Sequence, residues 1–198
     1  MDAKLEIRPI THSDFHHYID DLAYLRMRVF REWPYLYDGD MDYERSYLRS
    51  YVDNERTFMV GAFNAGDIVG ASTAMPLADH DEAFAAPLQL AGYDVSQIFY
   101  LAESVLLPDF RGLGAGRQFF DLREAEAARQ GFHQTVFSAV IRNADAPEKP
   151  QDYVPLDAFW QRIGYGQLAD IKASFPWKDL GDIEETEKSM AFWVKNLR

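Results

Sequence analysis

The sequence predicts an α/β protein with a central, mixed and twisted sheet of six to seven strands flanked by helices. Two observations carry this prediction. Residues 57–75 form two strands around a tight turn, which is the pattern of an antiparallel hairpin. Further along, a buried strand at 98–107, a long helix at 114–130 and a second buried strand at 135–141 require a parallel pair with a right-handed crossover. A sheet that contains both arrangements is mixed.

The chain opens with a short predicted strand at 5–9 and a helix at 18–30. The strand alternates apolar and polar residues and stops at a proline. In the helix, apolar residues recur near helical spacing, whereas Arg26, Arg28 and Arg31 fall on the other side. We therefore expect these three arginines to face solvent.

An aromatic loop at 33–40 separates that helix from the next one. A proline and a glycine end the helical pattern there, because proline lacks a donor and glycine permits unusual dihedral angles. Asp40 or Asp42 is then expected to cap a second helix, which ends before residues 53–54.

The remaining elements complete the sheet. A short helix at 82–90 is expected to be interrupted by Pro87. A second short helix is predicted at 156–163, because the glycine after it is a common helix terminator. Two closing strands are predicted at 167–175 and 189–194.

Composition narrows the class of protein. The 198 residues carry 20 basic and 32 acidic side chains, and the net charge of -12 argues against a nucleic-acid partner and favours a cationic one. The absence of cysteine excludes a thiolate nucleophile, a disulfide scaffold and a zinc–cysteine site. No apolar run approaches the ~20 residues of a membrane span, and the start does not resemble a signal peptide. We expect a single cytoplasmic domain over residues 1–198.

Three glycines between the strand at 98–107 and the following helix form the segment that carries chemistry. They are Gly112, Gly114 and Gly116, and they let the backbone approach a ligand closely. The first amides of a helix and its positive dipole end favour phosphate oxygens, and Arg111 and Arg117 add charge. A turn that only permits tight packing is the alternative interpretation.

The spacing of the glycines in this segment indicates which known phosphate-binding motif it matches. A P-loop lysine is missing, and a dinucleotide fingerprint would need glycine where Arg117 stands. The pattern Arg111-x-x-Gly114-x-Gly116, between a strand and a helix, resembles the GNAT superfamily of acyl-CoA-dependent N-acyltransferases. The phrase at 159–165, two aromatic residues and then glycine with a third aromatic, is similar to another segment of that family.

The resemblance implies a GNAT-like fold over nearly the whole chain and a function. The implied enzyme moves an acetyl or other short acyl group from acetyl-CoA, its co-substrate, to an amine by direct attack through a tetrahedral intermediate. Backbone at 104–106 would pair with the pantetheine arm, 112–117 would cradle the pyrophosphate, and an amide near Leu106 would stabilise the oxyanion. The residues that the resemblance assigns to the coenzyme are Ser104, Val105, Leu106, Arg111, Gly112, Leu113, Gly114, Ala115, Gly116, Arg117 and Asn143.

Acid–base groups are less well defined by the pattern. Glu103 is the first candidate for the base, because it is a carboxylate in an otherwise apolar strand. An ion pair with an arginine, or a side chain that points to solvent past a strand irregularity, is the alternative. Where the family often has a tyrosine that protonates the leaving thiolate, this chain has Trp160. Tyr153 is the nearby candidate for that acid, Tyr165 is expected in the core, and release of the thiolate without an acid is open.

The acceptor is expected at the aromatic loop, which borders the acceptor pocket in the resembled family. Tyr35, Tyr37 and Asp38 could hold an amine through ring faces and a carboxylate, although packing of these rings on the core is equally compatible. No metal site is expected, since Tyr43 and Arg49 occupy positions that a calcium loop needs for glycine and glutamate.

The favoured function is therefore N-acetylation of a small-molecule amine. Acetylation of a protein lysine or N-terminus is the alternative within enzymes. A non-catalytic acyl-CoA sensor is the alternative from another class, and Trp160 is its main support. Neither a nucleic acid nor a membrane is expected as a partner, and a homodimer is left open.

Overall fold

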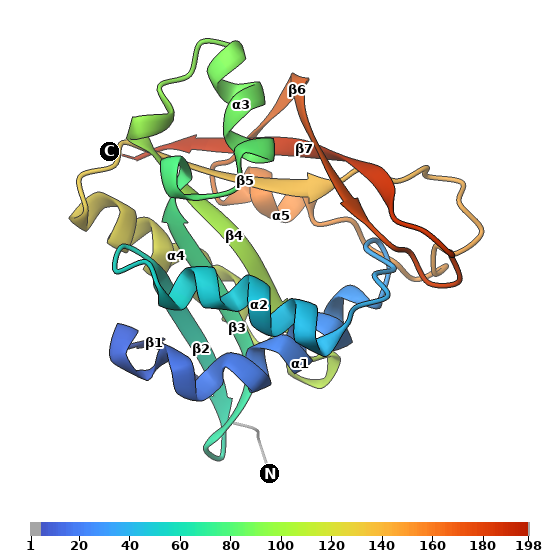
Figure 1. The fold of residues 1–198 in the computed structure, drawn as a ribbon, viewed down its shortest axis with the longest axis horizontal. Helices are drawn as coiled ribbons and strands as arrows, with labels where there is room; N and C mark the ends of the chain where they lie inside the picture. The colour runs from blue at the N-terminus through green and yellow to red at the C-terminus, as the bar shows by residue number, and fades with distance from the viewer. Residues whose placement is uncertain (1–4, 198) are drawn as a thin grey trace.

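The computed structural model describes residues 5–197, which form a mixed seven-stranded sheet in the order β1-β2-β3-β4-β5-β7-β6 (Figure 1). The fold class expected from the sequence is confirmed. The strands are β1 (Glu6–Ile10), β2 (Phe58–Asn64), β3 (Asp67–Pro76), β4 (Ile98–Leu106), β5 (Gln134–Val140), β6 (Gly166–Trp177) and β7 (Thr186–Asn196).

Five α-helices accompany the sheet in the described part of the chain. They are α1 (Ile19–Phe30), α2 (Met41–Val52), α3 (Glu82–Leu90), α4 (Ala115–Arg129) and α5 (Asp157–Arg162). Asp40 is the cap of α2, since its Oδ1 accepts from the amides of Asp42 and Tyr43. The interruption expected at Pro87 is wrong. The helix α3 continues through it, because burial of Phe84 and Leu88 offsets the one hydrogen bond that proline cannot donate.

The helices lie in layers on the two faces of the sheet. Figure 1 shows α1 and α2 in front of β2, β3 and β4, with α4 behind them. The core clusters follow this division, since Leu22, Leu25 and Tyr51 pack on one face and Phe119, Phe120 and Trp193 on the other. Helix α3 packs on β6.

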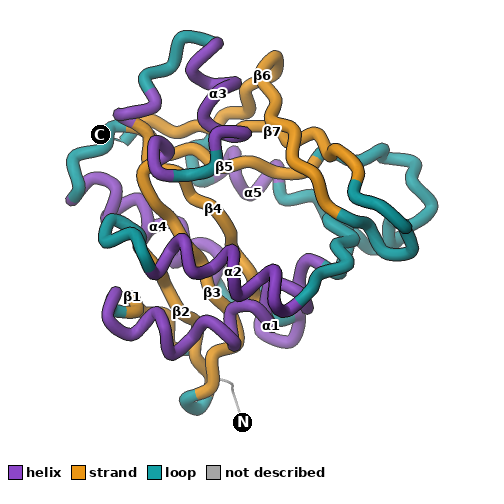
Figure 2. Tube along the Cα trace, in the orientation of Figure 1, coloured by secondary structure: helices purple, strands orange, loops and turns teal. Residues whose placement is uncertain are grey.

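The two central parallel strands separate along their length. β4 and β5 pair only where residues 98–100 meet 134–136. Beyond these pairs the strands diverge, as Figure 2 shows, while β5 stays paired with β7 to its end. The second half of β4 therefore has no strand partner on its β5 side.

A β-bulge interrupts β4 at this divergence. Ser72 pairs with Ser104 and Ala74 with Leu101, so Thr73 of β3 stands opposite two residues of β4. In a regular strand, residues 99, 101 and 103 would share one face. The extra residue reverses that alternation, and Glu103 turns toward α1 and α2 while Leu101 stays on the α4 side.

The aromatic loop between α1 and α2 is attached to the β6–β7 hairpin. The Arg142 guanidinium donates to the carbonyls of Pro34 and Tyr35 at 2.7 and 2.5 Å and to both carboxylate oxygens of Asp179. The amide of Asp38 donates to the carbonyl of Lys178 at 2.9 Å. Segments far apart in the sequence thus form one wall beside the sheet.

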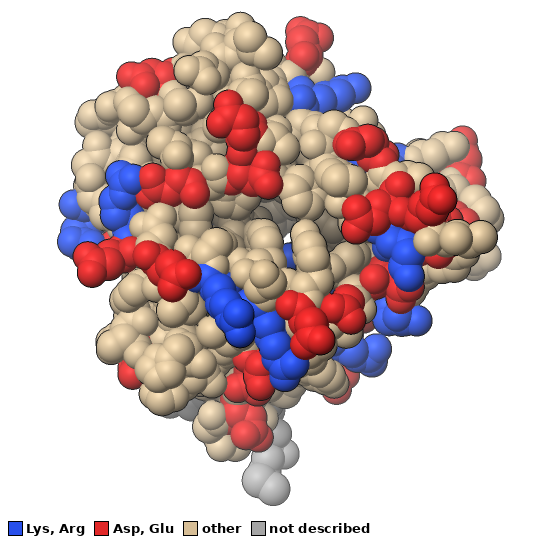
Figure 3. Space-filling view, viewed as in Figure 1, with Lys and Arg blue, Asp and Glu red and all other residues tan. Residues whose placement is uncertain are grey.

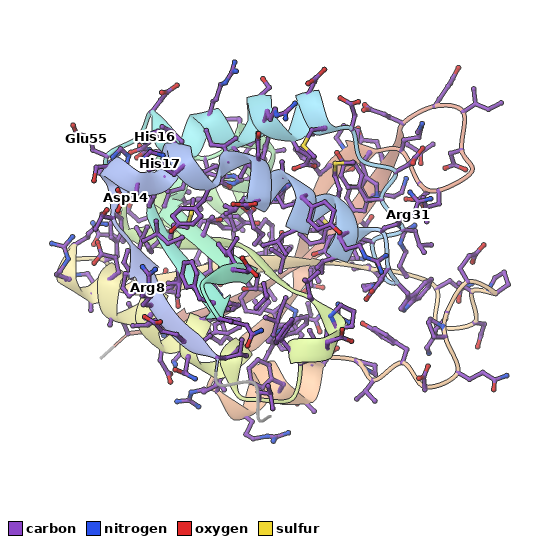
Figure 4. The ribbon with its side chains drawn as sticks, turned by 90° about the horizontal axis from the view of Figure 1, so that it is seen from below. Arg8, Asp14, His16, His17, Arg31 and Glu55 are labelled. Atoms are coloured by element: carbon purple, nitrogen blue, oxygen red, sulfur yellow. The ribbon has the colours of Figure 1, made fainter. Side chains whose placement is uncertain are left out.

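Two adjacent histidines lie in the short 3-10 helix (His12–Tyr18) that precedes α1. Figure 4 shows His16 and His17 near Asp14 and Glu55 at one end of the molecule, with Arg31 at the opposite end. No group of three or more metal-ligating side chains occurs within residues 5–197. None of the helices described for this stretch combines the length and apolar character that crossing a bilayer demands.

Candidate active site

A cavity of about 380 Å³ opens between α1, α2, the aromatic loop and the sheet. Arg26, Tyr47 and Glu103 line its buried end, and Tyr35 and Trp177 line its wall. Figure 3 shows the surface hollowed between α2 and the β6–β7 hairpin, with acidic side chains bordering the hollow. The divergence of β4 from β5 and the cavity therefore meet at the second half of β4.

The buried end of the cavity holds one arginine between two carboxylates. Arg26 donates from Nη1 to Glu103 Oε2 at 2.8 Å and from Nε to Glu44 of α2. Burial opposes the charge of Arg26, yet the two carboxylates outweigh it and hold the pKa of Arg26 well above its usual value. The prediction that Arg26 faces solvent is therefore wrong. Its side chain is 11% exposed, because hydrogen-bonded carboxylates compensate its burial.

A chain of hydrogen bonds joins Glu103 to His80. Tyr47 donates to Glu103 Oε2 at 3.4 Å, its hydroxyl lies 2.7 Å from that of Tyr51, and Tyr51 lies 3.3 Å from His80 Nε2. Each hydroxyl has one proton, so a chain that ends on the carboxylate requires Nε2 of His80 to be the protonated nitrogen. The other nitrogen, Nδ1, is then an acceptor, and it is buried without a partner, as is Glu103 Oε1.

His80 is neutral near pH 7. Burial lowers its pKa to about 4, and the positive charge of Arg26 acts in the same direction, while Asp81 opposes the shift. The neutral imidazole of His80 and the carboxylate of Glu103, at the two ends of this hydrogen-bond chain, therefore each keep one acceptor without a partner.

Lowering the pH from 6.5 to 4 is expected to reduce the free energy of unfolding by about 2 kcal/mol through His80 alone. The unfolded chain binds this proton near pH 6.5 and the folded chain only near pH 4, so the unfolded state gains protons first in this window. The full shift corresponds to about 3 kcal/mol, and the open cavity beside this half-buried ring reduces it.

Urea denaturation of wild type and His80→Gln at pH 7, 5 and 4 measures this contribution. The variant should lose less stability on acidification by the amount assigned to His80. His16→Gln, at an exposed histidine that does not line the cavity, is the matched control and should behave as the wild type does. An unchanged pH dependence in His80→Gln would show that this histidine protonates freely in the folded state.

The three residues predicted for the acceptor all line the cavity. The ring of Tyr35 lies 4.5 Å from that of Phe30 and 5.9 Å from that of Trp177, so it is also part of the packing. Burial and then the Glu44 carboxylate raise the pKa of Tyr37. Asp38 contacts Lys178 at 2.7 Å and Arg31 at 3.5 Å, and the hydrogen bond from Lys178 lowers its pKa. Its charge is therefore already compensated.

The glycine segment forms an open turn before α4. Gly112 and Gly114 have φ of 79° and 84°, a region that favours glycine, and Gly114 is the residue that precedes the first turn of α4. A Cβ atom at either position would meet nothing within 4 Å, and at Gly116 only a Phe159 carbon at 3.9 Å. The interpretation as a turn for tight packing is therefore not supported. A side chain at Gly112 or Gly114 would point into open space.

The two arginines of this segment are held by carboxylates. Arg111 contacts Glu32 at 2.9 Å and donates to the Leu106 carbonyl at 3.1 Å. Arg117 contacts Asp121 one turn further along α4 at 2.8 Å. Both side chains are about half exposed, at 46% and 55%, so they border the turn at its surface.

The free edge of β4 presents backbone groups toward the divergence. The amide of Leu107 donates to the Val69 carbonyl at 3.0 Å, so residues 105 and 107 face β3. By alternation, the amides of Ser104 and Leu106 point to the open side. Val105 differs from the other residues assigned to the pantetheine contact, since its backbone faces β3 and its side chain is 1% exposed.

The residues predicted beyond β5 lie at the surface or in the core. Asn143 is exposed, and its Oδ1 accepts from the Asp145 amide at 3.0 Å. The ring of Tyr153 lies 6.2 Å from that of Trp33, and burial raises its pKa. Tyr165 is 3% exposed, as expected for a core residue. Trp160 packs 5.1 Å from Trp193, which places it in the aromatic core behind the sheet.

Comparison with known proteins decides the family. Residues 8–149 match the sequence model of the acetyltransferase (GNAT) family. The chain belongs to the GNAT family. It is therefore an acyltransferase, and acetyl-CoA is its acyl donor. No curated protein matches the sequence significantly.

Solved acetyltransferase structures have a similar fold at low sequence identity. YncA of Salmonella typhimurium, solved with its cofactor acetyl-CoA, has a TM-score of 0.59 and 15% identity, covering 99% of this chain and 95% of its own. The ribosomal-protein-alanine N-acetyltransferase of Brucella melitensis gives 0.61 and 15%, covering 97% and 99%. An N-acetyltransferase of Staphylococcus aureus Mu50 gives 0.61 and 12%, covering 99% and 100%.

Several groups of the buried polar network next to the cavity were missed from the sequence. Glu44 and His80 lie in segments without a recognisable motif, so no local signal could have found them. Tyr47 and Tyr51 are four residues apart and share one face of α2, a spacing that could have indicated a joint role.

Proposed function

We propose that this GNAT enzyme acetylates the amine of a small molecule by direct attack on acetyl-CoA. The observation that carries the proposal is the free carboxylate oxygen of Glu103 at the buried end of a 380 Å³ cavity, beside the free edge of β4. A cavity of this volume suits a small molecule. The coenzyme site and the acceptor site then meet where β4 and β5 diverge.

The glycine turn and the free edge of β4 have the chemistry that the coenzyme requires. The open turn at Gly112 and Gly114, followed by the first amides of α4, offers donors and a positive dipole end to a pyrophosphate. The amides of Ser104 and Leu106 point to the side where a pantetheine arm would lie, as an added strand would. When bound, acetyl-CoA supplies the activated acyl group.

Glu103 is proposed as the base. Alkylamines are protonated at neutral pH, since their pKa lies near ~10.4, so a proton must leave the nitrogen before it attacks. Glu103 Oε1 is free to take this proton, while Oε2 stays bound to Arg26 and Tyr47. Overall, an ammonium and an acetyl thioester give an acetamide, a thiol and one proton. The Leu106 amide is proposed to stabilise the oxyanion.

Tyr153 is proposed as the acid that protonates the departing thiolate. It lies next to the aromatic loop, on the segment after β5. Its burial keeps the phenol protonated at neutral pH, as an acid requires. Tyr153→Phe separates this role from release without an acid: a loss of turnover with unchanged coenzyme affinity supports Tyr153, and unchanged turnover supports unaided release.

The proposal is tested by calorimetry with acetyl-CoA and by thiol release in the presence of amines. We expect tight binding of acetyl-CoA and release of thiol that depends on a small amine. Release that depends only on lysine peptides or protein N-termini would instead assign a protein acceptor. Binding without release from any amine would point to a sensor.

A further inference from the structure

We propose that the acceptor is a monoamine that enters as its ammonium on an aromatic or branched apolar body and carries no carboxylate. This inference rests on the proposed function and narrows it to one substrate class. It is drawn from the charges and surfaces of the cavity itself.

The walls of the cavity are aromatic. The rings of Tyr35 and Trp177 lie 5.9 Å apart on one side, and those of Phe84, Phe175 and Tyr100 pack at 5.4 to 5.5 Å on another. Ring faces suit an apolar body and attract a cation passing between them. The ring faces themselves offer no strong hydrogen bond to a sugar or to a second ammonium, and the polar groups of the lining include hydroxyls and carboxylates at the rim and the buried end.

The buried end carries an excess of negative charge. Arg26 supplies one positive charge against the carboxylates of Glu44 and Glu103, so the group of three has a net charge of -1. Uncompensated buried charge is unfavourable, and a bound cation would remove the imbalance. An ammonium also has three N–H donors, and two residues that line the cavity, Glu103 and His80, each have a buried acceptor atom without a partner.

A carboxylate on the substrate would meet no free positive charge. Arg26 and Lys178 are the cations among the described residues that line the cavity, and both already contact carboxylates. Asp40 and Asp81 at the rim add negative charge, while their side chains cap α2 and α3. The carboxylate of an amino acid would therefore meet negative charge both at the buried end of the cavity and at its rim.

A matched pair of acceptors tests this class. 2-Phenylethylamine and phenylalanine share one body and one amine, and differ by the carboxylate. We expect kcat/KM for 2-phenylethylamine, followed as thiol release from acetyl-CoA, to exceed that for phenylalanine by about 100-fold. Spermidine and a lysine peptide should also be poorer substrates than 2-phenylethylamine or 3-methylbutylamine.

The outcomes separate this inference from the proposed function. Faster release with phenylalanine, spermidine or the peptide would overturn the acceptor class and leave an acetyltransferase. Binding of acetyl-CoA with no release from any amine would overturn both. A thermal shift with 2-phenylethylamine alone, lost in Glu103→Gln and kept in Arg129→Lys, adds a readout that does not depend on turnover.

A different observation identifies a positioning residue: the geometry points to Arg123 as the group that holds the β4 bulge and so aims Glu103. Arg123 of α4 lies behind the sheet and is 1% exposed. It donates from Nη1 to the carbonyls of Thr73 and Glu103, both at 3.2 Å, and from Nη2 to Ser104 Oγ at 2.9 Å. These groups come from both strands at the irregular pairing, where a ladder is locally disrupted.

The planar guanidinium of Arg123, with N–H donors that point in several directions like a fork, is what holds the bulge. Among residues 5–197 no carboxylate forms an ion pair with Arg123. Its donors go to carbonyls, including that of Phe119 on its own helix, and to one hydroxyl. A regular strand would place residue 103 on the α4 side with Phe99 and Leu101. Arg123 occupies that side and binds the carbonyl of Glu103, so the side chain is directed into the cavity.

A double-mutant cycle tests this role. Arg123→Lys keeps a charge but loses the fork, and we expect about a 10-fold fall in kcat with little change in acetyl-CoA affinity. In a Glu103→Gln background the same change should cost less than about 2-fold, because the group being aimed is already absent. Equal losses in both backgrounds would show a merely structural role. Arg129→Lys, on the exposed side of the same helix, is the control.

Discussion

Replacing Gly114 by aspartate is expected to weaken acetyl-CoA binding about 100-fold and to leave the fold intact. The new carboxylate would lie at the start of α4, where the pyrophosphate is proposed to bind. Two like charges about 5 Å apart repel by about 3 kcal/mol at an effective dielectric of about 20. The fold tolerates the change, because a Cβ there meets nothing within 4 Å, and aspartate is one of the few side chains that visit positive φ, so the strain is confined to this turn.

Two further variants separate charge from shape. Gly114→Asn has the same size without the charge, so its affinity should fall much less. Gly131→Asp carries the same charge at a similar φ of 87°, also with open space, beyond the other end of α4. It should bind acetyl-CoA as the wild type does, measured by calorimetry. Wild-type affinity in Gly114→Asp would place the pyrophosphate elsewhere.

The fold could be predicted from the sequence because its signals are local. Hydrophobic alternation, prolines and glycines located the β2–β3 hairpin and the β4–α4–β5 crossover within a few residues. The glycine turn could be found for the same reason, since Gly112 and Gly114 directly before α4 and Gly116 in its first turn indicate a local backbone conformation.

The acid–base site could not be predicted in this way because it depends on pairing between distant segments. The direction of Glu103 follows from a bulge whose extra residue is visible only in the β3–β4 register. The burial of Arg26 follows from Glu44, which comes from the next helix. A helical pattern alone predicts that such an arginine faces solvent, because the pattern does not show that carboxylates from other elements will pair with it.

Replacing Glu103 by glutamine is expected to lower kcat by about 100- to 10,000-fold, the usual range for loss of a general base. Affinity for acetyl-CoA should hardly change, because the proposed coenzyme contacts are backbone groups at the glycine turn and the β4 edge. Folding should persist, since Arg26 keeps Glu44 as its partner and the group of three becomes neutral. Thiol release and calorimetry measure the two effects separately.

Glu44→Gln is the matched control for this experiment. It removes a carboxylate from the same arginine and leaves the same net charge, but Glu44 is fully buried and does not line the cavity. If Glu103 takes the proton from the amine, Glu44→Gln should retain most of its turnover where Glu103→Gln does not. Equal losses in the two variants would mean that the cavity needs only its negative charge, and the role of base would pass to another acceptor, of which His80 Nδ1 is the nearest candidate by its free lone pair.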